Sequence, residues 1–497
     1  MRRTTLDGAR ASMNGCRRWV CAVLALSVAV VTACAPPVQG EAKSILWNPD
    51  NVGGLPLTDG PSGIRSDAPD PEGRVRYSDG GPVDRLGMLA VNDAEEFWEA
   101  NYSPTLEGTF EPVQNYASWD SNDPNGPELC GQNGYKSPNA FFCYPLDLMA
   151  WDRGVLLPIG QKYFGDLSVA SVIAHEYGHA VQDMADIVDR SDPTVIGEQQ
   201  ADCFAGTYIR WVAEGKSPRF ELNTGEGLTK VLASILTSRD PVWNEEDQEM
   251  VTEGHGTALD RVTAFQMGFV EGVSACARID LDEIEARRGD LPIVLGTDDS
   301  GVEQTGEAQI NQKLVDTLIE QLNRQFKPTA PPKLSTDPAA QPCPDAKPTL
   351  VASYCPATNT ITVDMPAMQK FGAVADIEQG VLVQGDNTAI SVLISRYVLA
   401  LQHERNVSLN DAAASLRTAC LTGFAQRNMV EVEPLPSGSS ITLTAGDMDE
   451  AVAGLLNNGL VASDVDGETV PAGFSRIMAF RSGLLDTDGN ACYARFP

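Results

Sequence analysis

An internal repeat constrains the fold of this 497-residue chain more than any other feature of its sequence. Three segments of the first half match three segments of the second half in the same order: residues 171–182, 201–206 and 261–268 match residues 391–402, 418–423 and 476–483. Repeated segments at matched spacing are typical of a duplicated domain. The sequence therefore predicts two copies of one α+β domain, over residues 87–285 and 311–497, with residues 286–310 as a linker.

The first copy contains the pattern H-E-x-x-H, formed by His175, Glu176 and His179. In an α-helix, positions four residues apart lie on one face, so the two imidazole groups can bind one Zn²⁺. Glu176 then lies where it can act as the general base on a water at the metal. Gly178 costs a helix about 1 kcal/mol relative to Ala, and its presence predicts the close approach of another backbone.

A catalytic zinc usually has three protein ligands, and Glu198 is the predicted third ligand. Glu198 and Asp202 are also four residues apart, so they share a face of a second predicted helix. Asp202 is predicted to accept the Nδ1–H of a ligand histidine, which fixes the tautomer of that ring. The alternative reading of this pair is a solvated helix surface, but its position shortly after the first motif favours the metal site.

Both motifs and their surroundings resemble the bacterial neutral zinc metallopeptidases. The arrangement of the two motifs is like that of the gluzincins, and the chain resembles the lipoprotein peptidases of actinobacterial type. The resemblance rests on H-E-x-G-H-x-V-Q and E-x-Q-A-D-C-x-A-G, and it extends from about residue 91 to residue 276. It implies a zincin-like fold, one Zn²⁺ in the first domain held by His175, His179 and Glu198, and hydrolysis of peptide bonds. It implies no particular peptide or protein substrate.

Residues 254–261 resemble a further segment of that family, and their glycines indicate a loop or the start of a helix. His255 is predicted to line the cleft and to stabilise the oxyanion of the tetrahedral intermediate. Tyr177 is a second candidate for that role. The alternative is that His255 hydrogen-bonds to the backbone and serves local structure.

Each chemical position of the first copy is replaced in the second copy. The aligned pairs are His175 and Ser395, Glu176 and Arg396, His179 and Leu399, Glu198 and Ser415, and Asp202 and Ala419. The second copy is therefore predicted to be a pseudo-peptidase domain that keeps the fold and binds no catalytic zinc. Its predicted role is recognition or regulation, including contact with a partner protein of the cell envelope through residues 311–497. His403 is predicted to be a surface residue.

The chain contains 11 cysteines, and eight remain when Cys16, Cys21 and Cys34 are set aside as part of the N-terminal segment. An even number suits an oxidising compartment. If each copy forms its own disulfides and both copies pair alike, three connectivities remain. The favoured pairs are Cys130–Cys143, Cys203–Cys276, Cys343–Cys355 and Cys420–Cys492. The alternative is that some of the eight are buried free thiols.

Residues 1–33 are predicted to be a lipoprotein signal peptide, because a basic start is followed by an apolar stretch too short to span a bilayer. The stretch ends in a sequence that resembles a bacterial lipobox, so Cys34 is the predicted site of lipidation. An ordinary signal peptide is the alternative. Acyl chains such as palmitate would anchor the protein to the outer face of the cell membrane, and residues 34–86 would form a flexible tether.

The net charge of the chain limits the kinds of partner that it can bind. Its 68 acidic and 36 basic residues give a net charge of −32, which disfavours nucleic acid as a partner. The predicted function is that of a membrane-anchored zinc metallopeptidase that hydrolyses peptide bonds in the cell envelope. The alternative is a non-catalytic envelope lipoprotein whose zinc is structural and whose domains bind a partner. Structural zinc usually has four protein ligands, and Glu176 has no role in such a site.

Overall fold

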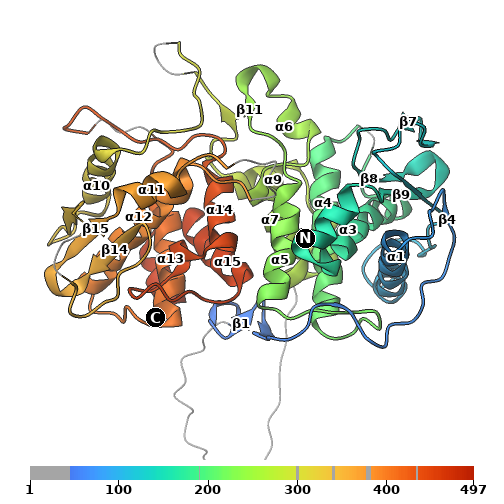
Figure 1. Cartoon of the computed structure of the whole chain (residues 1–497), viewed down its shortest axis with the longest axis horizontal. Helices are drawn as coiled ribbons and strands as arrows, with labels where there is room; N and C mark the ends of the chain where they lie inside the picture. Colours follow the sequence, from blue (N-terminus) through green and yellow to red (C-terminus); the bar gives the residue numbers. More distant parts are fainter. Residues whose placement is uncertain (1–44, 190, 298–300, 338–341, 376–381, 432–434) are drawn as a thin grey trace, which may run out of the picture. The chain divides into compact units, whose positions relative to one another are not determined.

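Two mixed sheets, several two-stranded pairings and a set of packed helices make up the computed structural model (Figure 1). It describes residues 45–497 except 190, 298–300, 338–341, 376–381 and 432–434. The predicted α+β class is confirmed. The predicted signal peptide and Cys34 lie outside the described residues. Within the described ranges, no helix has the length and apolar character needed to cross a membrane.

The described part of the first half, from residue 45 to residue 295, contains nine α-helices: α1 (Pro82–Asn101), α2 (Leu156–Phe164), α3 (Asp166–Ala185), α4 (Thr194–Ala213), α5 (Glu226–Thr237), α6 (Met250–Glu253), α7 (Ala258–Glu271), α8 (Val273–Cys276) and α9 (Leu281–Arg288). Its longer strands are β5 (Asn115–Trp119), β8 (Ala140–Cys143) and β9 (Leu148–Asp152). Its two-residue strands are β1 (Asn51–Val52), β2 (Leu55–Pro56), β3 (Gly63–Ile64), β4 (Val75–Arg76), β6 (Glu128–Leu129), β7 (Gln132–Asn133), β10 (Phe220–Glu221), β11 (Trp243–Asn244) and β12 (Val294–Leu295).

The described part of the second half contains α10 (Gln312–Phe326), α11 (Met365–Phe371), α12 (Asp386–Glu404), α13 (Ala412–Arg427), α14 (Asp447–Asn457), α15 (Gly473–Leu484) and α16 (Asn490–Arg495). Its strands are β13 (Lys333–Ser335), β14 (Ala352–Cys355) and β15 (Thr360–Val363). Single turns of 3₁₀-helix are η1 (Ile45–Trp47), η2 (Tyr144–Leu146), η3 (Glu245–Asp247), η4 (Pro356–Thr358) and η6 (Leu460–Ala462).

The sheet of the first half has the strand order β4-β5-β9-β8. The first three strands run parallel, and β8 pairs antiparallel with β9. All five residues of β9 are buried, as expected for an inner strand covered on both faces. The tight turn between β8 and β9 ends at Asp147, whose φ of 42° is left-handed. Because β8 comes last in the strand order, it is an edge strand of the sheet, and it lies against α3.

Helix α3 packs between α1 and α4, and α4 packs in turn against α7. A Cβ atom on Gly178 would lie only 2.9 Å from Ala201 Cα, so α3 and α4 approach each other too closely for a larger residue. The predicted close approach of another backbone to Gly178 is confirmed. Gly268 has the same role between α7 and α4, where an added Cβ would meet the carbonyl oxygen of Cys203.

The second half has a corresponding element order. Its sheet is ordered β13-β15-β14, with β13 parallel to β15 and β14 antiparallel to it, which matches the pairing of β5, β9 and β8. Helix α13 packs on α15 as α4 packs on α7. An added Cβ on Gly483 would meet the carbonyl oxygen of Cys420, which repeats the relation between Gly268 and Cys203.

The four favoured disulfides are confirmed as Cys130–Cys143, Cys203–Cys276, Cys343–Cys355 and Cys420–Cys492. The first and third of these each end at the last residue of a hairpin strand, Cys143 of β8 or Cys355 of β14. The second joins α4 to the short helix α8, which follows α7, and the fourth joins α13 to the short helix α16, which follows α15.

Removing the Cys203–Cys276 bond with paired Ser substitutions is expected to destabilise the protein by about 4 kcal/mol, because the bond closes a long loop in the unfolded chain. The sequence separation is 73 for this pair and 13 for Cys130–Cys143. The paired Ser variant of Cys130 and Cys143 should therefore lose only about 3 kcal/mol. Urea unfolding of the two variants checks this order, and a smaller loss at Cys203–Cys276 would contradict it.

The prediction of a flexible tether over residues 34–86 is wrong for its described part. Strand β4 pairs with β5, strand β3 pairs with β10, and the carbonyl oxygen of Gly53 accepts a hydrogen bond of 2.7 Å from Arg210 Nη1. Val52 is fully buried. Short strands in a Pro-, Gly- and Asp-rich segment leave no periodic signal, so the sequence did not reveal them.

The predicted start of the linker at residue 286 also needs correction, because it falls inside α9. Arg287 donates to the carbonyl oxygen of Asp260, and Arg288 pairs with the Asp260 carboxylate at 2.9 Å. Both arginines are buried. Helix α9 therefore belongs to the first half to its end.

The two halves contact each other directly through α7, α14 and α15. Asp449 Oδ1 accepts a hydrogen bond of 2.9 Å from Ala258 N, and Asp449 Oδ2 lies 3.1 Å from Arg239 Nε. Gln266 donates to the carbonyl oxygen of Phe474, whose ring also packs on that of Phe269. The first turn of α14 thus caps the start of α7.

Candidate metal centre

Helices α3 and α4 bring the three predicted metal ligands together. His175 and His179 lie one turn apart on α3, with ring centroids 5.0 Å apart. The carboxylate of Glu198, from α4, reaches both rings: its Oε2 lies 3.1 Å from His175 Nε2 and its Oε1 lies 3.5 Å from His179 Nε2. One ligand atom from each of the three residues lies within 4.8 Å of the other two.

These separations fit a zinc ion. Tetrahedral Zn²⁺ with nitrogen and oxygen bonds of about 2.0–2.1 Å keeps its ligand atoms about 3.3 Å apart. The observed 3.1 and 3.5 Å lie on either side of that value. Two imidazoles and one carboxylate are also a donor set that suits zinc.

Each histidine has a hydrogen-bond partner on the side away from Glu198. His175 Nδ1 lies 2.9 Å from Asp202 Oδ1, as the sequence predicted. His179 Nδ1 lies 2.9 Å from Gln182 Oε1, and the amide group of Gln182 is oriented by a 2.6 Å hydrogen bond from its Nε2 to the carbonyl oxygen of Gly197. Both Nδ1 atoms therefore carry the proton in the neutral rings, which leaves both Nε2 atoms free to bind a metal.

Asp202 is itself held by Arg261. The guanidinium group donates from Nε to Asp202 Oδ2 and from Nη2 to Asp202 Oδ1, both at 2.8 Å, and all of these groups are buried. Thr257 and Asp260 form a capping box at the start of α7, which fixes the turn that carries Arg261. Desolvation opposes ionisation of Asp202, but Arg261 and His175 outweigh it and lower the pKa of Asp202 to about 2.

The carboxylates near His175 and His179 raise the pKa of both histidines in the metal-free protein. Burial disfavours the charged form of His175, yet Asp202 and Glu198 together raise the pKa of His175 to about 10. Burial likewise opposes protonation of His179, and Glu198 overcomes it, so the pKa of His179 is also raised. The pKa of Glu198 is well below its ordinary value, since the two histidines outweigh the effect of its burial.

Glu176 faces a cavity of about 200 Å³ that is also lined by His175, His255 and Arg261. Its side chain is buried, and no described residue supplies a hydrogen-bond partner to its carboxylate. Burial raises the pKa of Glu176, although the two nearby histidines oppose that shift. A buried carboxylate with a raised pKa and an open face toward a cavity is suited to carry a proton.

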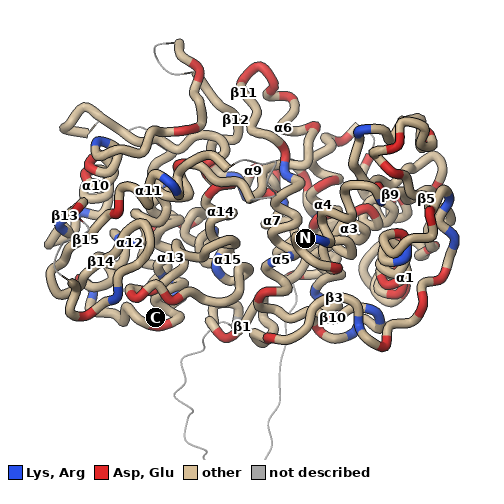
Figure 2. The backbone as a smooth tube through the Cα atoms, in the orientation of Figure 1, with Lys and Arg blue, Asp and Glu red and all other residues tan. Residues whose placement is uncertain are grey.

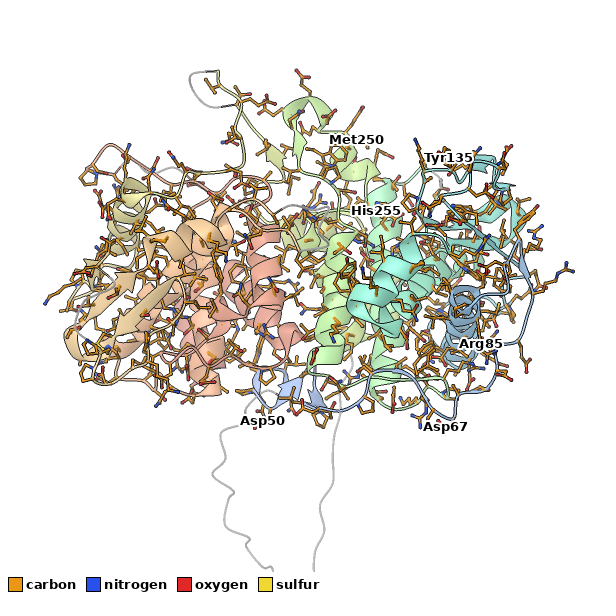
Figure 3. The ribbon with its side chains drawn as sticks, viewed as in Figure 1. Asp50, Asp67, Arg85, Tyr135, Met250 and His255 are labelled. Atoms are coloured by element: carbon orange, nitrogen blue, oxygen red, sulfur yellow. A yellow bond between two sulfur atoms is a disulfide. The ribbon has the colours of Figure 1, made fainter. Side chains whose placement is uncertain are left out.

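His255, which is labelled in Figure 3, comes from the loop between α6 and α7. Its Nε2 lies 3.5 Å from Glu198 Oε2, its Nδ1 lies 3.5 Å from Asp240 Oδ1, and half of its side chain is exposed. Gln199 donates to its carbonyl oxygen at 2.8 Å. His255 thus lines the cavity as predicted, and its backbone is anchored as well. It is outside the set of mutually close ligand atoms.

The structure places Tyr177 away from the cavity, which corrects its predicted role at the oxyanion. Tyr177 is fully buried, and its hydroxyl oxygen accepts a hydrogen bond of 3.3 Å from Val113 N. On a helix, the position two residues after His175 faces the opposite side. Tyr177 therefore belongs to the core between α3 and the segment before β5.

The sequence reasoning missed three residues of the centre: Gln182, Arg261 and Asp240. Two of them are identical in the second copy of the repeat: Gln182 aligns with Gln402, and Arg261 aligns with Arg476. Persistence in a copy that has lost the metal ligands is typical of packing positions, so it did not indicate contact with the centre. Asp240 had no signal, since its contact with His255 depends on the loop after α5.

The aligned site in the second half is filled by Arg396. This side chain is 1% exposed and donates to the carbonyl oxygens of Asp464 and Leu460 and to Ser463 Oγ. Ser415 Oγ, at the position aligned with Glu198, donates to the carbonyl oxygen of Glu468. His403 is exposed, as predicted, and its Nδ1 lies 2.9 Å from the hydroxyl group of Tyr354.

No protein family and no solved structure matches this chain. A stretch of 152 residues, 27% of the chain, is 26% identical to uncharacterised proteins of Mycobacterium bovis (strain ATCC BAA-935 / AF2122/97) and Mycobacterium tuberculosis (strains CDC 1551 / Oshkosh and ATCC 25618 / H37Rv). That stretch covers 52% of each relative, so the chain spans about half the length of the curated relatives it matches. These similarities assign no family and no activity to the chain.

Proposed function

We propose that the protein is a zinc-dependent peptidase whose metal is held by His175, His179 and Glu198. The observation that carries the proposal is the convergence of these three side chains beside Glu176, a buried carboxylate that faces the cavity. When bound, Zn²⁺ would act as a Lewis acid that polarises both a water molecule and the scissile carbonyl group.

The roles of the protein groups follow from their positions. Glu176 accepts a proton from the attacking water and passes it to the leaving amine, a transfer for which its raised pKa is suited. Asp202 and Gln182 hold the two imidazoles in the tautomer that presents Nε2 to the metal. His255 is placed to donate a hydrogen bond to the developing oxyanion from the open side of the cavity.

The edge strand β8 suits a peptide substrate in extended form. Asp152 N donates to the carbonyl oxygen of Asn139 at 2.9 Å, which sets the phase of the hydrogen bonds between β8 and β9. Because antiparallel pairs alternate, the amide and carbonyl groups of Ala140 and Phe142 point away from β9. Asn139 and Ala140 line the same cavity as Glu176. A peptide that paired with β8 would therefore pass beside the metal centre.

The proposal includes a zincin-like domain that is duplicated, with the second copy inactive. The matched sheet orders, the matched disulfides and the matched glycine contacts support duplication. Arg396 supports loss of the metal site in the second copy, because its buried cation stands where the first copy has Glu176. Attachment to the outer face of the cell membrane through lipid on Cys34 remains part of the proposal, with recognition or regulation as the role of residues 311–497.

A structural zinc site is the weaker candidate. Such a site would need a fourth protein ligand. His255 Nε2 lies 3.5 Å from Glu198 Oε2, but His255 is not among the residues whose ligand atoms lie within 4.8 Å of one another. A structural zinc site would also give the buried carboxylate of Glu176 no chemical role.

The test is cleavage of a proteome-derived peptide library by the zinc-loaded full chain, with new peptide termini read by mass spectrometry. Cleavage that stops with 1,10-phenanthroline and returns with added Zn²⁺ is expected. Absence of any new terminus from a folded, zinc-loaded protein would contradict peptidase activity.

Zinc binding is expected to release protons near pH 7. The pKa of about 10 keeps His175 protonated in the metal-free protein, and a metal can bind Nε2 only after that proton leaves. The apparent affinity for zinc should therefore rise about tenfold per pH unit for each proton released, as long as the pH is below that pKa. Calorimetric titration in two buffers with different enthalpies of ionisation counts the protons.

The matched variant is Asp202→Asn, which removes the charge that raises the pKa of His175 most. It should release fewer protons at pH 7 than the wild type. Equal release by both proteins would show that Asp202 does not control the protonation of His175.

A further inference from the structure

Four carboxylates meet in the second half, away from the candidate zinc centre, at the first turns of α12 and α14. Asp386 begins α12, Asp447 begins α14, Glu450 lies one turn further along α14, and Glu307 comes from the segment before α10. Ligand atoms of Glu307, Asp386 and Glu450 all lie within 4.8 Å of one another. Asp447 adjoins Asp386. Acidic residues occur along the whole backbone (Figure 2), but here three of the four are buried.

Each of these side chains has one oxygen fixed by a backbone amide. Asp386 Oδ2 accepts from Ala308 N at 2.8 Å, Glu450 Oε2 accepts from Asn387 N at 2.8 Å, and Glu307 Oε2 accepts from Asp386 N at 3.2 Å. Asp447 Oδ2 accepts from Thr444 N. The backbone thus holds one oxygen of each carboxylate in place.

The second oxygen of Asp386 has no partner. Asp386 is 4% exposed, and its Oδ1 is buried without any hydrogen bond from the described part of the chain. None of the four side chains forms an ion pair with a Lys or Arg within the described ranges. A buried carboxylate oxygen without a donor is costly, and other carboxylates next to it add repulsion.

Gly385 leaves the space that the cluster needs. A Cβ atom at this position would meet Glu450 Oε1 and would lie 2.7 Å from Glu307 Oε1. The two oxygens that accept no backbone amide therefore come together at one face of Gly385. Together with the neighbouring carboxylate of Asp386, they form a set of oxygen atoms that only a shared proton or a cation can stabilise.

We propose that Glu307, Asp386, Asp447 and Glu450 bind a calcium ion. Ca²⁺ takes six to eight oxygen ligands at about 2.3–2.6 Å, so two oxygens on opposite sides of the ion are about 4.6–5.2 Å apart. The ligand atoms of Glu307, Asp386 and Glu450 all lie within 4.8 Å of one another, which fits that span, and Asp447 adjoins Asp386. Mg²⁺ demands bonds of about 2.0–2.1 Å in a near-ideal octahedron, which ligands from three separate chain segments satisfy less readily.

The ion would join the segment before α10 to the starts of α12 and α14. The same turn of α14 carries Asp449, which accepts from Ala258 N at the start of α7 and pairs with Arg239. Arg239 precedes Asp240, the carboxylate beside His255. Calcium would thus fix the turn through which the second half contacts the candidate zinc centre.

Equilibrium dialysis of the full chain with ⁴⁵Ca²⁺, with Zn²⁺ and Mg²⁺ both in excess, tests the site. We expect one bound Ca²⁺ per chain in the wild type and at least about tenfold weaker binding in Asp386→Asn. Asparagine keeps the oxygen that accepts from Ala308 N, so this variant should fold. Glu450→Gln serves as the second variant on the same reasoning.

Two controls make the result specific. Asp316→Asn makes the same change on an exposed position of α10 and should bind calcium as the wild type does. Glu198→Ala should also keep calcium binding, which separates this site from the proposed zinc site. A folded wild type that binds no Ca²⁺ at millimolar concentration, or an Asp386→Asn variant that binds it equally, would show that the carboxylates share protons instead.

Discussion

The substitution Glu176→Gln is expected to lower kcat/KM for peptide cleavage by about 10²–10⁴-fold while zinc stays bound. Glutamine has almost the same shape as glutamate and keeps one side-chain oxygen toward the cavity, but it cannot accept the proton of the attacking water. Glu176 makes no hydrogen bond to a described residue, so the change should leave the fold intact. Kinetics on a cleaved library peptide, together with zinc analysis of the same sample, measures both effects.

The matched control for this prediction is Glu285→Gln, which makes the same chemical change at an exposed position of α9. Its activity should equal that of the wild type. If Glu176→Gln lost its zinc, the role of Glu176 as a proton carrier would be wrong, because the residue would then be needed to hold the metal. Retained activity with zinc bound would contradict the proposed mechanism directly.

The substitution Arg261→Met is expected to destabilise the metal-free protein by about 3–5 kcal/mol. It removes the guanidinium group that donates two hydrogen bonds of 2.8 Å to Asp202, and it leaves a buried carboxylate without its main counter-charge. Urea unfolding measures the loss of free energy. Zinc affinity should fall as well, because Asp202 would no longer hold His175 in a fixed orientation.

Two further variants serve as controls for the stability of Arg261→Met. Arg278→Met changes an exposed arginine of the same half and should alter the free energy of unfolding by less than about 0.5 kcal/mol. The double variant Arg261→Met with Asp202→Asn should recover part of the stability, since the uncompensated charge is gone. A loss below about 1 kcal/mol in Arg261→Met would mean that the pair contributes little.

Helical spacing, together with the short interval between the two motifs, was enough to predict the three metal-ligand candidates. His175 and His179 had to share one face of α3, and Glu198 and Asp202 had to share one face of α4, whichever way the helices packed. The spacing also predicted that Asp202 contacts one of the two histidines, and in the structure it lies beside His175. These contacts depend only on the two motif helices and on the close approach that Gly178 allows between them.

Contacts that depend on the packing of an element outside the two motif helices could not be predicted from the sequence. Arg261 reaches Asp202 only because α7 packs on α4, and His255 reaches Asp240 only through the loop after α5. The same limit explains the error over residues 45–81, where strands of two residues pair with distant partners. The placement of Tyr177 was wrong for a different reason, because its position on the helix, two residues after His175, already excluded it.

The disulfides were predictable because the repeat supplied a second constraint. Eight cysteines alone allow many pairings, whereas the requirement that both halves pair alike leaves three. The confirmed pairs join matching elements in the two halves. The repeat did not reveal the carboxylate cluster at Asp386, because the first half carries no corresponding group of acidic residues among its described ligand clusters.

Zinc content is the most direct test of the central claim. Purified full chain, reloaded with zinc and dialysed, should hold one equivalent of Zn²⁺, and both His175→Ala and Glu198→Ala should lose it. Ser395→Ala changes the position that aligns with His175 in the second half, and it should keep the full equivalent. A folded wild type without zinc, or a Ser395→Ala variant that loses it, would contradict a single metal centre built by His175, His179 and Glu198.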